Sequence, residues 1–148
     1  MSSHIAVIIN ASAGFGYSSE WAGSLADKFR SHGLEARVTL ARSGDEMIEA
    51  ANSAVREGAG AIVAGGGDGT VNAVASAVIG SGTAFGVLPL GTLNHFAKDL
   101  RIPLELDEAV ANIAAGNSIK VDAGEVNGRV FLNNSSLGLY PDIIRNRE

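Results

Sequence analysis

The sequence predicts an α/β domain with an open, mostly parallel sheet, helices on both faces, and antiparallel strands beginning near the C-terminus. Short apolar runs rich in β-branched residues alternate with amphipathic helical segments. The first run, residues 5–9, is apolar throughout, which is typical of a strand covered on both faces. Near residue 117 this rhythm gives way to a period of two.

The elements follow in a regular order. Strands are expected at residues 5–9, 35–40, 61–64 and 85–88. The first helix begins near Ser19 and ends at Gly33. Ser43 and Glu46 have the spacing of a capping box and open the second helix. The apolar faces of the four expected helices are Trp21, Leu25 and Phe29; Met47, Ile48, Ala51, Ala54 and Val55; Val71, Val74, Ala75 and Val78; and Val110, Ile113 and Ala114.

The C-terminal part has a different pattern. Ile119, Val121 and Ala123 alternate with polar or small residues, and Asn127 and Gly128 form a strong hairpin signal. We therefore expect residues 1–132 to form one domain. Residues 133–148 are interpreted as the start of a second β domain or the linker to it, with the rest of that domain missing from this chain, or alternatively as a frayed terminus.

Composition excludes several classes of function. The formal net charge of -5 argues against a groove for nucleic acid. The absence of cysteine excludes disulfides and thiol catalysis and fits a reducing compartment. Since no apolar run approaches the roughly 20 residues needed to cross a bilayer, we expect a cytoplasmic protein.

A glycine-rich segment between the third strand and the third helix is the strongest functional signal. Gly66, Gly67 and Gly69 would let successive backbone N–H groups point at one anion, beside the positive end of a helix dipole. Asp68 lies inside this segment and would repel a bare phosphate. It is either a helix cap turned away, a group that engages a metal ion on the phosphate, or a base facing the phosphoryl acceptor.

Three loops are expected to meet at one edge of the sheet. They follow the first, third and fourth strands, at residues 10–16, 65–70 and 89–95. Parallel strands place such loops together at their carboxyl ends, where ligands bind. The first loop lacks the third glycine of a dinucleotide fingerprint, which would fall at Ser19, and no glycine loop continues into Lys-Ser or Lys-Thr.

At these loops the chain resembles the catalytic domain of diacylglycerol kinases and related lipid and sphingoid kinases. The resemblance rests on Gly-Gly-Asp-Gly-Thr-Val-Asn at residues 66–72 and Pro-Leu-Gly-Thr-Leu-Asn at residues 89–94. Gly-Asp at residues 44–45 and Val-Asp at residues 121–122 also match. The resemblance extends from residue 5 to about residue 139 and implies transfer of the ATP γ-phosphoryl group to a diacylglycerol-like lipid hydroxyl, with Mg²⁺ offsetting phosphate charge.

The resemblance also implies a set of site residues. Asp68 would be catalytic, orienting the acceptor hydroxyl or a metal-bound water. No metal ligands and no oligomeric state are predicted. The nucleotide-binding set is Asn10, Ala11, Ser12, Ala13, Gly14, Thr39, Gly66, Gly67, Asp68, Gly69, Thr70, Val71, Asn72 and Thr92.

Three positions depart from the family pattern. Ala11 replaces a proline, which is expected to loosen the first loop. The family has a nucleotide-contacting threonine after the second strand. Counting without gaps from Gly44 and Asp45 places Leu40 at that position, so the adjacent Thr39 is the candidate. His95 stands where the family often has aspartate, and it is interpreted as a cap of the helix beginning at Asn94 or as a group that changes the acceptor.

The family also carries a second, mostly β domain with further acidic residues and the lipid cleft, which 148 residues cannot hold. We therefore expect this chain alone to be inactive or weakly active, with peripheral contact to the inner membrane face through the missing part. The alternatives are an NAD kinase-like phosphotransferase with a soluble acceptor, a non-catalytic nucleotide-binding module, and a plain α/β interaction domain.

Overall fold

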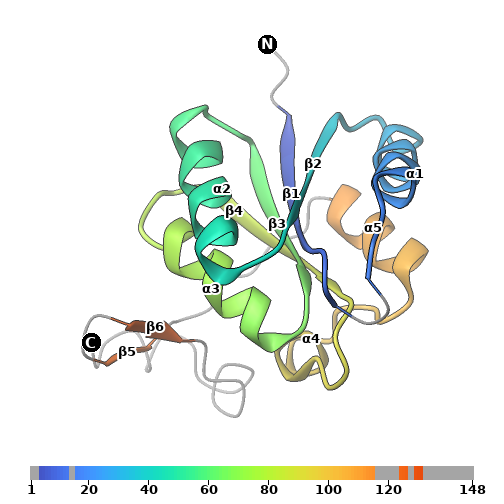
Figure 1. The fold of residues 1–148 in the computed structure, drawn as a ribbon. Helices are drawn as coiled ribbons and strands as arrows, with labels where there is room; N and C mark the ends of the chain where they lie inside the picture. The colour runs from blue at the N-terminus through green and yellow to red at the C-terminus, as the bar shows by residue number, and fades with distance from the viewer. Residues whose placement is uncertain (1–3, 14–15, 116–123, 127–128, 132–148) are drawn as a thin grey trace.

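A computed structural model describes residues 4–13, 16–115, 124–126 and 129–131 of the chain (Figure 1). Its main sheet has four parallel strands in the order β2-β1-β3-β4. The predicted α/β class with an open parallel sheet is therefore confirmed. The strands are β1 (Ile5–Asn10), β2 (Ala36–Ala41), β3 (Ala61–Gly66) and β4 (Ala84–Pro89).

Helices cover both faces of this sheet, as Figure 1 shows. On one face, α2, α3 and α4 bury Met47, Val74 and Phe96 against alternate side chains of the central strands. On the other face, α1 and α5 bury Phe29 and Val110. The helices are α1 (Ser19–Arg30), α2 (Gly44–Arg56), α3 (Asp68–Val78), α4 (His95–Asp99) and α5 (Leu106–Ala114).

Local sequence signals explain where the first two helices begin and end. The hydroxyl of Ser18 accepts a hydrogen bond from the N–H of Trp21 at the start of α1, and Gly33 has a φ of 82° in the turn after it. The hydroxyl of Ser43 accepts from the N–H of Glu46, as predicted. In a capping box the Glu46 carboxylate would accept a hydrogen bond from the N–H of Ser43. Here it accepts from the N–H of the preceding residue, Arg42.

Three predicted loop boundaries are wrong, because β1 extends to Asn10, β4 extends to Pro89 and β3 extends into the glycine segment. Gly65 and Gly66 are not loop residues; they are the last residues of β3, in register with Leu88 and Pro89 of β4. A Cβ added at Gly65 would collide with the Ile9 side chain on β1. A side chain at Gly65 would therefore displace the Ile9 side chain, so glycine is favoured here by packing of β3 against β1 rather than by a loop.

Two short strands lie beyond the main sheet. β5 (Gly124–Val126) pairs antiparallel with β6 (Arg129–Phe131). The expected alternation at Ile119, Val121 and Ala123 and the turn at residues 127–128 lie outside the described residues, as do the motif residues 121–122 and the segment 133–148. The proposed division into two domains stays a prediction.

Candidate phosphate-binding site at the carboxyl edge of the sheet

The candidate site lies at the carboxyl ends of β1, β3 and β4. β1 has β2 on one side and β3 on the other, so the chain changes direction across the sheet between β1 and β3. The helix after β1 packs on one face and the helix after β3 on the opposite face. This is the topological switch point at which open α/β sheets bind ligands.

The first loop begins at Asn10 and is held by hydrogen bonds on both sides. The Asn10 side-chain amide donates to the Thr70 hydroxyl at 3.3 Å, and its carbonyl oxygen accepts from the Ser12 N–H at 3.0 Å. The Ala11 N–H donates to the Ala41 carbonyl at the end of β2 at 2.8 Å. A proline has no such donor, so Ala11 ties this loop to β2 by a bond that the family's proline could not make.

The turn between β3 and α3 contains a single residue, Gly67. It is the N-cap of α3 and provides no side-chain hydrogen bond to the helix. Within the part of the chain that the structure describes, the N–H groups of Asp68, Gly69 and Thr70 donate to no acceptor. A Cβ added at Gly69 would meet no atom within 4 Å. The start of α3 thus presents three unpaired donors beside open space, the arrangement of an anion site.

Asp68 is engaged with a different helix. Its two carboxylate oxygens accept hydrogen bonds from the N–H groups of His95 and Phe96, each at 2.9 Å. These are the first two residues of α4. Of the three roles left open for Asp68, the structure shows capping, and the capped helix is α4 rather than α3. Each oxygen retains a second lone pair, so the carboxylate can accept further bonds.

The third loop packs tightly against the second. Asn94 has φ 53° and ψ 48°, a left-handed conformation that asparagine tolerates, and its side chain bonds both the N–H and the carbonyl of Gly91, at 2.9 and 2.8 Å. A Cβ at Gly91 would collide with the Gly67 Cα. The Leu90 N–H donates to the Gly66 carbonyl at 3.1 Å. The two glycine segments therefore form one compact unit.

The structure brings only part of the predicted residue set together. Asn10, Gly66, Gly67, Asp68 and Thr70 are linked to a neighbouring loop by the contacts given above. Thr92 is exposed on the third loop, and Ser12 is exposed on the first. Asn72 and Ala13 are half-buried, and Gly14 lies outside the described residues.

Two other predicted residues lie away from this unit. Val71 is 2% exposed and packs in the core, so only its backbone faces the turn. Thr39 is exposed on β2, while the neighbouring Leu40 lines a surface pocket. Successive side chains of a strand point to opposite faces, so Thr39 faces away from that pocket.

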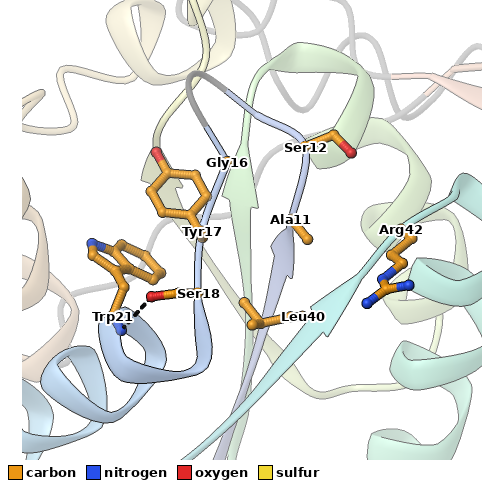
Figure 2. A pocket seen from close by; sticks show the side chains of 8 residues that line it. All are labelled: Ala11, Ser12, Gly16, Tyr17, Ser18, Trp21, Leu40 and Arg42. Atoms are coloured by element: carbon orange, nitrogen blue, oxygen red, sulfur yellow. Dashed lines mark hydrogen bonds between the residues drawn. The ribbon is translucent and has the colours of Figure 1, made fainter.

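Sequence reasoning missed this pocket, which lies beside the first loop (Figure 2). Its volume is about 780 Å³. The rings of Tyr17 and Trp21 are 4.2 Å apart between centroids, and burial raises the pKa of the Tyr17 phenol. The pocket is lined by Ala11, Ser12, Gly16, Tyr17, Ser18, Trp21, Leu40 and Arg42.

Arg42 gives the pocket a positive charge. Its guanidinium makes no hydrogen bond or ion pair with any side chain in the described ranges. Figure 2 shows Leu40 between this guanidinium and the Tyr17–Trp21 pair. The pocket therefore combines aromatic and aliphatic surface with a guanidinium that has no side-chain partner among the described residues. Trp21 is half-buried and packs against the core as the helical pattern predicted, while it also lines this pocket.

The described residues contain no cluster of three or more histidine, aspartate or glutamate residues that could hold a metal ion. Their helices include none that combines the length and the apolar character needed to span a membrane.

The fold and the three joined loops define an α/β domain with a candidate anion-binding edge. Comparison with known families is specific: the diacylglycerol kinase catalytic domain matches residues 4–126. The chain belongs to this family, as the sequence motifs indicated.

Related proteins agree with this assignment, and solved structures agree with the fold. The chain is 36% identical over 113 residues to "Probable lipid kinase YegS" of Escherichia fergusonii, and equally identical to "Probable lipid kinase YegS-like" of Citrobacter koseri. Each match covers 74% of this chain but 38% of the relative, so the chain spans well under half the length of these relatives. The crystal structure of a diacylglycerol kinase from Bacillus anthracis str. Sterne has the same fold, with a TM-score of 0.73 at 22% identity, over 88% of this chain and 50% of that one.

Proposed function

We propose that this chain is the ATP-binding part of a lipid kinase that transfers the ATP γ-phosphoryl group to a diacylglycerol-like lipid hydroxyl. Membership in the diacylglycerol kinase catalytic domain family and the lipid kinase names of its relatives support this proposal. The observation that carries it is the start of α3. Among the described residues, the N–H groups of Asp68, Gly69 and Thr70 have no acceptor at this switch point of the parallel sheet, and a Cβ at Gly69 would meet no atom within 4 Å.

The phosphates of ATP fit the chemistry of this edge. The unpaired donors and the helix dipole favour an anion, and the absence of a side chain at Gly69 allows close approach. The Thr70 hydroxyl accepts from Asn10, so its own proton can be donated to a phosphate oxygen. Phosphoryl transfer requires positioning and charge stabilisation above all, and these groups would supply both.

Mg²⁺ would accompany the phosphates. It binds proteins through one or two carboxylates together with phosphate oxygens and waters, and it would offset phosphate charge. Asp68 is the carboxylate at this edge, and its remaining lone pairs would serve a metal-bound water or the acceptor hydroxyl. The pocket lined by Tyr17 and Trp21 would hold the nucleoside, because two residues of the first loop, Ala11 and Ser12, also line that pocket.

The lipid is proposed to bind outside the described residues. The relatives are more than twice as long as the matched region, and their remaining length has room for a lipid-binding part. We propose that this part contacts the cytoplasmic face of the membrane peripherally. The 148-residue chain alone is then expected to bind ATP and to transfer phosphate weakly or not at all.

Two measurements test the proposal. ATP with Mg²⁺ should raise the melting temperature of the 148-residue chain, because a ligand that binds only the folded state stabilises it. A full-length polypeptide containing this sequence should transfer labelled phosphate from ATP to diacylglycerol within a panel of lipid hydroxyls and NAD. Transfer to NAD alone would indicate the soluble-acceptor alternative, and ATP binding without transfer to any acceptor would indicate a non-catalytic module.

A further inference from the structure

We propose that Asp68 is a positioning residue that fixes the third loop of the site by capping α4 from the first turn of α3. Its carboxylate accepts from both His95 and Phe96 at 2.9 Å, although these residues are 27 and 28 positions further along the chain. The inference rests on the proposed function in one respect only, namely that the third loop contributes to ATP binding. The hydrogen bonds themselves require no ligand.

α4 depends on this distant cap because it has none of its own. Its N-cap residue, Asn94, makes no side-chain hydrogen bond to the helix, since both ends of its amide are bonded to Gly91. A helix leaves its first N–H groups without internal partners. Asp68 therefore supplies the acceptors that a local N-cap would otherwise provide, and as a carboxylate it suits the positive end of the helix.

The capped helix determines where the third loop lies. Phe96 and Ala97 are 3% and 1% exposed and belong to the same buried cluster as the apolar face of α3. Their burial holds α4 against the core. On the near side, residues 91–94 are folded back by Asn94 onto Gly91, which touches Gly67. Asp68 links the start of α3 to the start of α4, while Gly91 packs on Gly67. The exposed Thr92 lies between Gly91 and α4 in sequence, so its position relative to the start of α3 is fixed.

An amide cannot replace the carboxylate at this position. Asp68 presents two acceptors to two N–H donors, whereas asparagine has one acceptor oxygen and an NH₂ group that donates. Asp68→Asn would thus keep the shape, lose one hydrogen bond and place a donor against a donor. The same substitution on a purely catalytic carboxylate would leave the third loop undisturbed.

Hydrogen exchange of the nucleotide-free 148-residue chain tests the cap directly. In Asp68→Asn, the amides of His95 and Phe96 should exchange roughly tenfold faster or more, in line with the net worth of a hydrogen bond to a charged group. Unchanged exchange at both amides would overturn the proposal. Glu105→Gln is the matched control, because the Glu105 carboxylate caps α5 in the same two-oxygen manner, at 3.1 and 3.0 Å to the N–H groups of Asp107 and Glu108. It should accelerate those two amides and leave α4 unchanged.

A binding cycle tests whether the cap serves the site. We expect Thr92→Ala to weaken ATP binding about fivefold, the order expected for one lost hydrogen bond, and to have under half that effect in the Asp68→Asn background. Equal effects in both backgrounds would show that Asp68 does not position Thr92 and would overturn this part of the inference. If the unmodified chain binds no ATP, the proposed function fails, while the exchange experiment still decides whether Asp68 holds α4.

Discussion

The Asn10 amide donates to the Thr70 hydroxyl across 60 residues of sequence, joining the end of β1 to the first turn of α3. The two residues lie on either side of the switch point of the sheet. Asn10 also holds the Ser12 N–H, so one side chain orders the first loop and orients the hydroxyl at the start of α3. The first and second loops are thereby joined directly.

Removing the Thr70 hydroxyl should destabilise the fold. Thr70 is 4% exposed, and valine in its place would leave the Asn10 amide without this partner. We expect Thr70→Val to lower the free energy of unfolding by about 1 kcal/mol, measured by urea denaturation. In a cycle with Asn10→Ala, the two effects should be coupled by roughly 0.5 kcal/mol or more. Additive effects would mean that the bond contributes nothing. Thr70→Ser, which keeps the hydroxyl, should retain ATP affinity better than Thr70→Val.

Alanine should have opposite effects on stability at two glycines of the site. Gly91→Ala would push a methyl group into the Gly67 backbone, and we expect a loss of about 1–3 kcal/mol in unfolding free energy. Gly69→Ala has open space in a helical turn and should gain up to about 1 kcal/mol. Both variants should bind ATP more weakly by calorimetry. If Gly69→Ala binds ATP normally, no phosphate approaches the start of α3 closely.

The ion pair between Lys28 of α1 and Asp107 of α5 predicts a dependence on pH. The hydrogen bond to Asp107 at 2.6 Å, with its negative charge, raises the pKa of Lys28 above 10.5. A raised pKa in the folded state means that the stabilisation is fully present below pH 10.5 and is lost as pH rises through the folded pKa. The stability difference between the unmodified chain and Asp107→Asn should therefore stay constant from about pH 7 to 9 and shrink above 10.5.

Asp27→Asn provides the control for this titration. Asp27 pairs with Arg30 on the same helix, and a guanidinium keeps its charge throughout this range. The stability difference for this variant should not shrink between pH 9 and 11 in the same urea titrations. An equal decline in both variants would trace the effect to general alkaline unfolding rather than to Lys28.

Patterns local in sequence predicted most of the fold. Buried parallel strands are apolar throughout, so β1 could be recognised from five consecutive residues, and the Ser43 cap required only the residue three positions on. The meeting of the three loops also followed from sequence, because parallel strands carry their carboxyl ends to one edge. Gly65 and Gly66 were misassigned because a glycine run is typical of a loop, and their strand partners on β4 are known only in three dimensions.

The arrangement of the site depends on contacts that no local pattern encodes. Asp68 reaches His95 only after α3 and β4 have returned the chain to the same edge, so sequence could raise capping as a role without naming the helix capped. The aromatic pocket was missed for the same reason. Tyr17 and Trp21 are close in sequence, but Leu40 and Arg42 join them through the pairing of β1 with β2.

The pocket offers an optical test, because Trp21 is the only tryptophan of the chain. If the nucleoside of ATP binds there, its addition should change the Trp21 emission. Arg42→Ala should weaken ATP binding about tenfold, the order expected for a hydrogen bond to a charged group. Arg56→Ala is a suitable control, since Arg56 lies at the other end of α2 and is engaged with Ser53 and Glu49. ATP binding seen by calorimetry without any change in emission, and with Arg42→Ala unaffected, would place the nucleoside outside this pocket.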